Sequence, residues 1–394
     1  MHSSAKIPDK YRPIFLAVLF LVAFAFRFYN FNQKQTYVFD EMYHVPTAVN
    51  YVEKGFLGPE EGYHPPLRHL LMYAGIRTFG NNPYGWRLRN IALGSATVVA
   101  LFLLAESIFG AGLVAYGSAA LLLLDPLHIA TSRGSFDEIQ SGFFLVCAVY
   151  FVFKALSSDR ERDLVFAGVF FGLSAATKWY AFFPLFCLLV SVGARQLRRH
   201  RWKDVLKLLS YLLVLPATIY LLAYIPWFLR GNSIPAWVRL QRDAFWSVSR
   251  MRNDSFTNIE LLRPLGNPLT WFLRPISVAV DSRGGSFFTL MNNFPVWIFL
   301  LPAVFYLLYT GIKESRLGSS LVAATFLSLY IPFLLSSRPS FLYSAVILLP
   351  FCFIALAFAA EEILGKYAYL FLAGALSISL FLYTFIARGA AVTF

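Results

Sequence analysis

Long apolar segments, separated by short polar or glycine- and proline-containing stretches, run through almost the whole chain. An apolar helix of roughly 20 residues crosses the hydrocarbon core of a bilayer, and about eleven segments here approach that length. They lie near residues 14–30, 87–107, 111–129, 136–155, 164–178, 180–197, 208–228, 294–311, 318–336, 341–360 and 367–387. The pattern predicts an all-α polytopic membrane protein whose first span is retained and not cleaved as a signal peptide.

Composition supports a membrane protein and not a nucleic-acid-binding one. Of the 394 residues, 58% are hydrophobic and 14% charged, whereas ordinary soluble domains carry roughly 25% charged residues. The net charge of +13 lies largely in short loops, where basic residues set membrane orientation and meet anionic lipid headgroups. We therefore expect the lipid bilayer, and no nucleic acid, as a partner. The three cysteines lie inside apolar segments, so we interpret them as core residues.

Loop charge predicts the topology. If the N-terminus is cytoplasmic, the most basic loop, residues 195–207, is also cytoplasmic, as the positive-inside rule requires. Two long loops, about 31–86 and 229–293, then face the non-cytoplasmic side. Both contain apolar residues at helical spacing, which is typical of helices at a membrane interface. We expect one membrane-embedded domain over residues 1–394, with an N-terminus in the cytoplasm.

An adjacent carboxylate pair, Asp40 and Glu41, follows the first apolar segment. Ionised side chains at the end of a membrane span cost solvation free energy unless a partner or a function keeps them there. They therefore mark a candidate site. A helix N-terminus, where acidic side chains interact favourably with the helix dipole, explains the same pair equally well. Taken alone, the two residues do not decide between these interpretations.

The predicted topology brings further polar residues to the same side of the membrane. They are His64, Arg87, Arg89, Arg133, Asp137, Lys178, Arg274 and Arg338. Cations around a carboxylate pair suit a reaction in which a phosphate leaves. Arginine and lysine stabilise the charge on the leaving group, while a carboxylate accepts a proton from an attacking hydroxyl.

Each of these residues also has a purely structural interpretation. For Asp137 and Glu138 we favour an ordinary acidic helix N-terminus. Lys178 beside Trp179 is, without context, typical of a lysine that extends to the membrane surface. Headgroup anchoring or a simple chain turn accounts for the others: Arg87, Arg89 and His64. The functional hypothesis therefore depends on the co-location of the whole set.

Ordered motifs extend over most of the chain. In chain order they are FDE, HPPL, GWRLRN, LLLLDPLHIATSRGSFDE, ATKWYAFF, NPLTWFLRP and SRPSFLYSAVILLPF. This set resembles the protein O-mannosyltransferases (dolichyl-phosphate-mannose-protein mannosyltransferases), which are integral-membrane enzymes of the GT-C superfamily of glycosyltransferases. The resemblance covers about residues 30–350.

The resemblance implies an inverting transfer of a sugar, most readily mannose, from a polyprenyl or dolichyl phosphate to a Ser or Thr hydroxyl of a protein. The reaction would take place on the external face of a prokaryotic plasma membrane or the lumenal face of the endoplasmic reticulum. Asp40 would be the catalytic carboxylate, and Glu41 would position the acceptor or the base. The implied donor-phosphate residues are Arg133, Lys178, Arg87, Arg89 and Arg338. The implied substrate-binding residues are His64, Asp137, Trp179, Trp271, Arg274 and Tyr343.

Departures from the family pattern leave the acceptor open. The chain lacks the lumenal β-trefoil insert of the eukaryotic members, and Tyr343-Ser344 stands where the family has a Tyr-His pair. One alternative is a lipid or glycan acceptor, as in the related aminoarabinose transferases. A second alternative is a non-catalytic transporter or scaffold. Transport sites gather polar groups near the bilayer midplane in repeated halves, whereas here they cluster at span ends, which favours an enzyme.

Cofactors and further partners are less constrained. No spacing demands a metal ion, although four histidines are candidate ligands for a divalent metal: His44, His64, His69 and His128. We therefore assign no metal site and keep a divalent metal as an alternative. A homodimer or heterodimer is likewise kept as a partner hypothesis.

Overall fold

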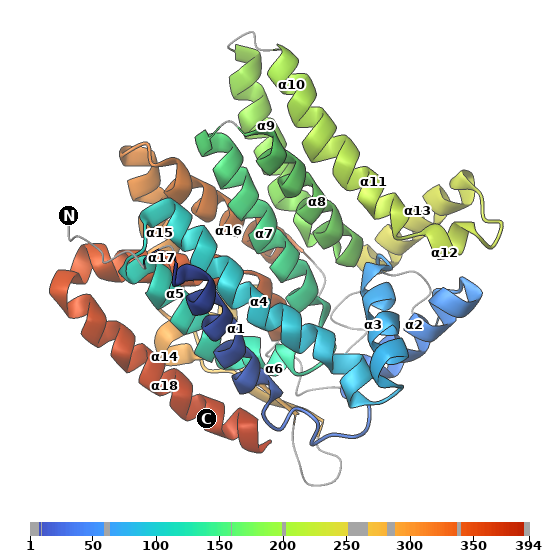
Figure 1. The fold of residues 1–394 in the computed structure, drawn as a ribbon, viewed down its shortest axis with the longest axis horizontal. Helices are drawn as coiled ribbons and strands as arrows, with labels where there is room; N and C mark the ends of the chain where they lie inside the picture. The colour runs from blue at the N-terminus through green and yellow to red at the C-terminus, as the bar shows by residue number, and fades with distance from the viewer. Residues whose placement is uncertain are drawn as a thin grey trace.

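The computed structural model describes residues 8, 10–58, 64–158, 160–198, 202–250, 267–281, 288–336 and 340–389. Helices dominate (Figure 1). Those of the first half are α1 (Arg12–Phe28), α2 (Glu41–Lys54), α3 (Leu67–Phe79), α4 (Pro83–Phe109), α5 (Leu113–Leu124), α6 (Pro126–Ser132), α7 (Asp137–Ser158), α8 (Glu161–Thr177) and α9 (Phe182–Arg198). Those of the second half are α10 (Trp202–Leu209), α11 (Leu215–Leu222), α12 (Ile225–Phe228), α13 (Ile234–Arg250), α14 (Phe294–Trp297), α15 (Leu300–Lys313), α16 (Leu317–Leu335), α17 (Leu349–Leu364) and α18 (Ala368–Arg388).

Local sequence signals set the ends of α4. Asn82 precedes the helix, and its side chain accepts hydrogen bonds from the backbone N–H groups of Tyr84 and Gly85 at 2.9 and 3.4 Å. Pro83 occupies the first helical position, where its missing N–H costs nothing. The helix ends at Gly110, whose φ of +85° suits glycine. The start of α4 is therefore well defined, and this is the end of the helix that lies near the site.

Six helical segments are long and apolar enough to cross a membrane, or seven if the bent pair α5–α6 counts as one span; this count covers the described residues only. The expected count of eleven is not confirmed. One reason is that α5 and α6 meet at a bend of 57°. Pro126 cannot continue the hydrogen-bond ladder of α5, and Asp125 caps α6 by accepting from the His128 N–H at 2.8 Å. A second reason is that the last two expected spans, near 341–360 and 367–387, are counted as one apolar segment, Leu349–Arg388. The turn Gly365–Tyr367 lies within that segment.

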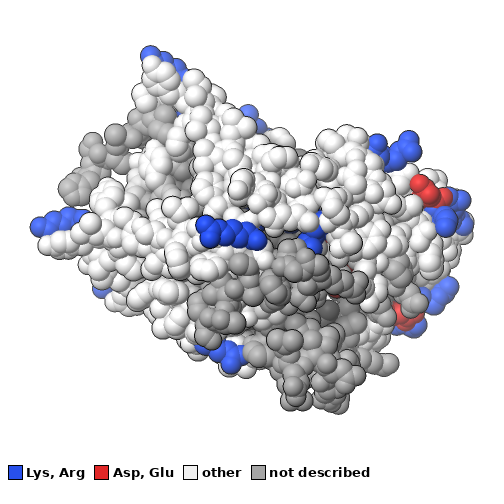
Figure 2. All heavy atoms as spheres, turned by 90° about the horizontal axis from the view of Figure 1, so that it is seen from below, with Lys and Arg blue, Asp and Glu red and all other residues white. Residues whose placement is uncertain are grey.

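The core of the bundle lies around α17. Every residue of this helix from 349 to 360 is buried, and it packs against α5, α15 and α16. The outer helices expose large apolar side chains instead, among them Leu213, Ile312, Leu370 and Phe381. Figure 2 shows few acidic groups on the face drawn there, with the basic groups scattered and mostly near its margins. Such a surface is suited to lipid contact, so the chain is an integral membrane protein.

The two predicted external loops contain ordered elements. Helices α2 and α3 lie where the first loop showed helical spacing, and α13 lies in the second loop. Whether they rest at a membrane interface stays a prediction. The prediction of an all-α chain was wrong in one detail, because the structure contains a small β-hairpin. In it, β1 (Ser277–Asp281) pairs antiparallel with β2 (Phe288–Met291). Ser277 lies opposite Met291, and the register shifts between Ala279 and Asp281.

Helix direction brings several chain segments to one end of the bundle. Helices α7 and α8 follow one another directly in sequence and pack together, so the start of α7 lies near the end of α8. Helix α4 packs against α7, and α2 and α3 lie beside this end (Figure 1). The 3-10 turn η7 (Leu342–Ile347) also packs against α7. These segments surround the candidate site.

Candidate active site

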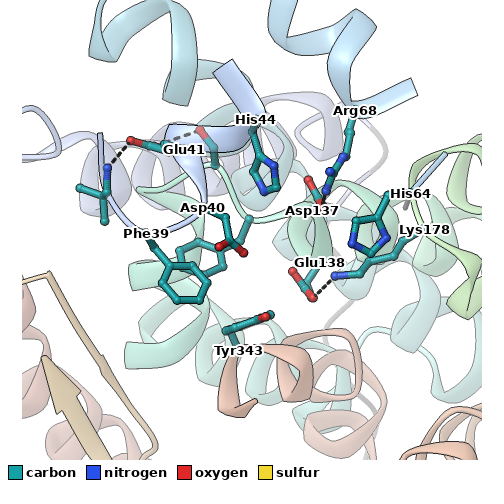
Figure 3. A pocket seen from close by; sticks show the side chains of 13 residues that line it. Phe39, Asp40, Glu41, His44, His64, Arg68, Asp137, Glu138, Lys178 and Tyr343 are labelled. Carbon is teal, nitrogen blue, oxygen red and sulfur yellow. Dashed lines mark hydrogen bonds and ion pairs between the residues drawn. The ribbon is translucent and has the colours of Figure 1, made fainter. Parts of the chain in front are cut away.

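A polar pocket of about 70 Å³ lies at this end of the bundle (Figure 3). Its walls come from the start of α2, the segment before α3, the start of α7, the residue after α8 and the turn η7. The lining residues are Val38, Phe39, Asp40, Glu41, His44, His64, Arg68, Ser135, Phe136, Asp137, Glu138, Lys178 and Tyr343. The pocket thus gathers four carboxylates, and three of them form ion pairs with side chains of the described residues.

Glu41 is held in a closed network. Its carboxylate accepts from Nε and Nη2 of Arg87 at 2.9 and 2.7 Å, from the Ser135 hydroxyl at 3.0 Å and from the Val38 N–H at 2.9 Å. Arg87 also donates to the carbonyl oxygens of Lys34 and Thr36 at 2.7 and 2.9 Å. Because both oxygens of Glu41 are fully engaged, this carboxylate is suited to a structural role and poorly suited to proton transfer.

The two carboxylates at the start of α7 are paired with cations from elsewhere in the chain. Asp137 forms a buried ion pair with Arg68 of α3. Glu138 accepts from the Lys178 ammonium at 2.5 Å, and only 13% of the Lys178 side chain is exposed. The pair does form the acidic first turn of a helix, as expected. It also lines the pocket, and a functional role for these residues stays a prediction.

Asp40 differs from its three neighbours. It occupies the N-cap position of α2, yet its side chain makes no capping hydrogen bond. Within the described part of the chain, its carboxylate has no hydrogen-bond or ion-pair partner, although it lines the pocket. Burial raises the pKa of the Asp40 carboxyl, while His44, Arg68 and Lys178 oppose that shift. An unpaired carboxylate with a raised pKa is a candidate general base.

The residue before Asp40 has an unusual backbone. Phe39 has a φ of +52°, a left-handed conformation that is a clear outlier for a bulky residue. Such a conformation costs on the order of 1–3 kcal/mol and is found most often at functional sites. In an extended chain, consecutive side chains point to opposite sides. Here both Phe39 and Asp40 line the same pocket.

A second, apolar pocket of about 270 Å³ adjoins the first. The two share Lys178 and Tyr343. Most of its walls are aromatic or aliphatic and come from the 3-10 turn η1 (Trp179–Ala181), α9, α13, α16 and the residue before η7: Trp179, Tyr180, Phe183, Phe245, Val248, Leu329, Pro332, Phe333 and Phe341. The Lys178 ammonium lies 5.2 Å from the Tyr180 ring centre and 5.9 Å from that of Tyr343. Lys178 thus stands where the polar pocket meets the apolar one.

Comparison with known proteins bears directly on this arrangement. The family model described as dolichyl-phosphate-mannose-protein mannosyltransferase matches residues 17–234, more than half of the chain. The chain belongs to this family. The resemblance read from its motifs is thereby confirmed.

Curated relatives extend the match over nearly the whole chain. The polyprenol-phosphate-mannose–protein mannosyltransferase of Corynebacterium glutamicum is 23% identical over 434 residues, which cover 91% of this chain and 84% of that protein. The protein of the same name from Mycolicibacterium smegmatis is 24% identical and covers 89% of this chain and 82% of the relative.

Two solved structures of membrane proteins share the fold of this chain. The Saccharomyces cerevisiae Pmt1–Pmt2 protein O-mannosyltransferase complex, bound to its sugar donor, superposes with a TM-score of 0.78 at 12% identity over 98% of this chain and 91% of that one. ArnT from Cupriavidus metallidurans, bound to undecaprenyl phosphate, gives a TM-score of 0.64 at 16% identity over 94% of this chain. This chain spans 64% of ArnT, slightly less than two thirds. The fold is therefore that of the GT-C enzymes.

The structure brings together several of the predicted site residues. Six of them line the polar pocket: Asp40, Glu41, His64, Asp137, Lys178 and Tyr343. Trp179 lines the apolar pocket, and its indole N–H donates to the Tyr220 hydroxyl at 2.9 Å. The roles assigned to these residues stay predictions.

Other predicted donor-phosphate residues lie elsewhere. Arg87 and Arg133 line a separate cavity of about 30 Å³. Arg133 donates to the Ile386 carbonyl at 2.9 Å, and Arg89 donates to the Trp86 carbonyl. Arg338 lies outside the described residues. Phosphate binding by these arginines stays a prediction, and for Arg87 the geometry instead supports a role in holding Glu41.

The predicted residues of the second loop lie beside the hairpin. Trp271 is fully buried, with its ring centre 5.4 Å from that of Phe333. The Asn292 side chain donates to the carbonyl oxygens of Trp271 and Arg274 at 2.8 and 2.9 Å. The segment that carries these two residues is thus tied to the end of β2.

Arg68 and Glu138 also line the pocket. In the sequence, Glu138 is typical of an ordinary helix-terminal acid, and Arg68 carries no signal beyond its place after HPP. His44 was considered only as a metal ligand, yet it lines the pocket one helical turn after Asp40. In the described ranges, no group of three or more His, Cys, Asp or Glu side chains is placed to hold a metal ion. Metal dependence stays untested.

Proposed function

We propose that this chain is an inverting glycosyltransferase that moves mannose from a polyprenyl phosphate donor to a Ser or Thr hydroxyl of a protein. Family membership and the named bacterial relatives support the reaction class. The single observation that carries the mechanism is the Asp40 carboxylate, which lines the pocket without a hydrogen-bond or ion-pair partner among the described residues, whereas the neighbouring acids have cationic partners.

The contrast among the carboxylates supports Asp40 as the base. Glu41, Asp137 and Glu138 each have a cationic side chain bound to the carboxylate, so these carboxylates are less accessible to the hydroxyl of an acceptor. The Asp40 carboxyl has a raised pKa because of its burial. In the proposed step, Asp40 takes the proton of the acceptor hydroxyl while the oxygen attacks the anomeric carbon from the side opposite the phosphate. The C–O bond to the phosphate breaks, and the configuration inverts.

In this proposal, Lys178 binds the leaving phosphate. It stands where the polar pocket meets the apolar one, so a lipid phosphate bound there would put its hydrocarbon chain among aromatic side chains and its sugar near Asp40. A cation stabilises the charge that develops on the departing phosphate. A phosphate is already a good leaving group, so the step needs no general acid.

We also propose the topology predicted from loop charge: one membrane domain over residues 1–394, about eleven spans, and a pocket that opens on the non-cytoplasmic face. Cysteines introduced singly into residues 195–207 and 31–86 should react with a membrane-impermeant label from opposite sides. Labelling of both loops from one side would overturn this arrangement.

The decisive test is transfer of radiolabelled mannose from polyprenyl phosphate mannose into the protein, lipid and glycan fractions of membranes that contain this chain. We expect label in protein with the wild type and none with Asp40→Asn. Label confined to the lipid or glycan fraction would replace the acceptor assignment. Undiminished transfer by Asp40→Asn would remove Asp40 from the mechanism.

A further inference from the structure

Three aromatic rings form one wall of the polar pocket. The Phe39 ring centre lies 5.7 Å from that of Phe136, with the rings stacked, and 5.6 Å from that of Tyr343, with the rings edge to face. The centres of Phe136 and Tyr343 are 5.3 Å apart. All three residues line the pocket. The wall is therefore a continuous aromatic surface and not a chance exposure of one ring.

The pocket has two chemically different sides. Figure 3 shows Phe39 and Tyr343 on one side, with Glu138 and Lys178 and, beyond them, His44, Asp137 and Arg68 opposite. A pyranose ring has the same division, because its axial C–H groups make an apolar face and its hydroxyl groups point outward from the edge. Aromatic faces pack against the first, and charged or polar side chains bind the second. A phosphate or a serine side chain alone would not need an aromatic wall.

The backbone of Phe39 links this wall to the proposed base. Its left-handed conformation, with φ of +52°, stands directly before Asp40 and lets two consecutive side chains line one pocket. The wall and the proposed base are therefore adjacent in the chain and line the same pocket. Strained backbone of this kind persists where the surrounding structure holds it in place, and it is concentrated at active sites.

We propose that Phe39, together with Phe136 and Tyr343, is the surface on which the donor sugar packs, and that the left-handed backbone of Phe39 sets the sugar in register with Asp40. This inference rests on the proposed function. Phe39 acts as a sugar-contacting, specificity-determining residue, and the lipid and phosphate parts of the donor are bound by other groups.

The test compares two ligands of equal chain length, polyprenyl phosphate and polyprenyl phosphate mannose, in binding to purified protein. Phe39→Leu keeps apolar volume but removes the aromatic face. We expect about three- to tenfold weaker binding of the mannose-bearing ligand and unchanged binding of the bare phosphate. Phe39→Tyr keeps the ring, so it should retain the wild-type preference between the two ligands.

Phe341→Leu is the matched control. Phe341 stacks on Tyr343 with ring centres 5.7 Å apart, but it lines the apolar pocket and not the polar one. Its replacement should weaken both ligands by the same factor. Phe39→Met serves as the second variant if Phe39→Leu does not give a single folded species in size-exclusion chromatography.

The outcomes separate the two proposals. Suppose that the wild type binds both ligands. If the ring-removing variants then lose affinity equally for both ligands, or keep full affinity for both, Phe39 is not a sugar contact. The proposed function is unaffected by that result. If the wild type binds neither ligand, the proposed function itself fails. Selective loss of the mannose-bearing ligand in Phe39→Leu, with the preference retained in Phe39→Tyr, is the result that supports the inference.

Discussion

The carboxylate of Glu41 and the guanidinium of Arg87 meet in a two-point ion pair, with N–O distances of 2.9 and 2.7 Å. Both side chains are almost completely buried. The pair ties the first residue of α2 to α4, and thereby holds the neighbouring Asp40 in the pocket. Two adjacent acids, which look equivalent in the sequence, thus have opposite environments: one is enclosed in hydrogen bonds, and the other is unpaired.

Breaking this pair should destabilise the protein. Arg87→Met would leave the buried charge of Glu41 without its partner, and we expect the free energy of unfolding to fall by about 3–5 kcal/mol. Glu41→Gln combined with Arg87→Met should recover a large part of that loss, because no unpaired charge remains. Thermal unfolding in detergent micelles measures both. Equal stabilities of the single and double variants would contradict this account.

Replacing the proposed base should separate binding from chemistry. Asp40→Asn keeps the size of the side chain but removes its ability to accept a proton, so mannose transfer should fall by at least about 100-fold. Donor binding should change little, since we propose that Lys178 and not Asp40 binds the phosphate. Glu314→Gln is the control: this acid pairs with Arg316 on the surface, between α15 and α16, and its loss should leave transfer unchanged. A parallel loss of donor binding in Asp40→Asn would argue for a binding role.

The pH dependence of transfer should report the environment of Asp40. Burial raises the pKa of this carboxyl, and a general base works only when deprotonated. Activity should therefore fall as the pH is lowered through the raised pKa. That fall should begin at a higher pH than expected for an ordinary aspartate, whose pKa is about 3.9. The measurement is kcat/KM against pH. An acidic limb at or below the ordinary value would contradict the assignment.

Lys178 should contribute to donor binding through its charge. Lys178→Gln removes the cation at the junction of the two pockets and leaves Glu138 uncompensated, so affinity for bare polyprenyl phosphate should fall by about tenfold or more. Lys178→Arg keeps the charge and should lose less. Lys207→Gln controls for a general effect of charge, since Lys207 is exposed and pairs with Glu161 on the surface. Wild-type affinity in Lys178→Gln would place the phosphate elsewhere.

The backbone of Phe39 should reverse the usual stability order of alanine and glycine. Phe39→Ala and Phe39→Gly both remove the ring, but only glycine adopts positive φ without a steric penalty. We expect the glycine variant to match or exceed the alanine variant in stability, by up to about 1 kcal/mol. Thermal unfolding of the two purified variants compares them. A clearly more stable alanine variant would mean that the left-handed conformation is absent in the protein.

Part of the site was predictable because the order of the membrane spans determines on which side of the membrane each polar residue lies. Alternating helix direction places the ends of nonconsecutive segments together, and this brought Asp40 and Lys178 into one predicted constellation. It did not identify Arg68 or Glu138. Arg68 meets Asp137 across 69 residues of sequence, and Lys178 meets Glu138 across 40. No local pattern records which cation approaches which acid.

The length and hydrophobicity of the apolar segments were enough to predict a membrane protein, because the bilayer acts on each segment separately. The ordered motifs were enough for the family. Only the tertiary structure distinguished Asp40 from Glu41, placed Arg87 and Arg133 in a cavity separate from the polar pocket and revealed the aromatic wall. These features depend on distances between helices that are remote in the chain, and charge pairing in a buried site changes sharply over a few ångströms.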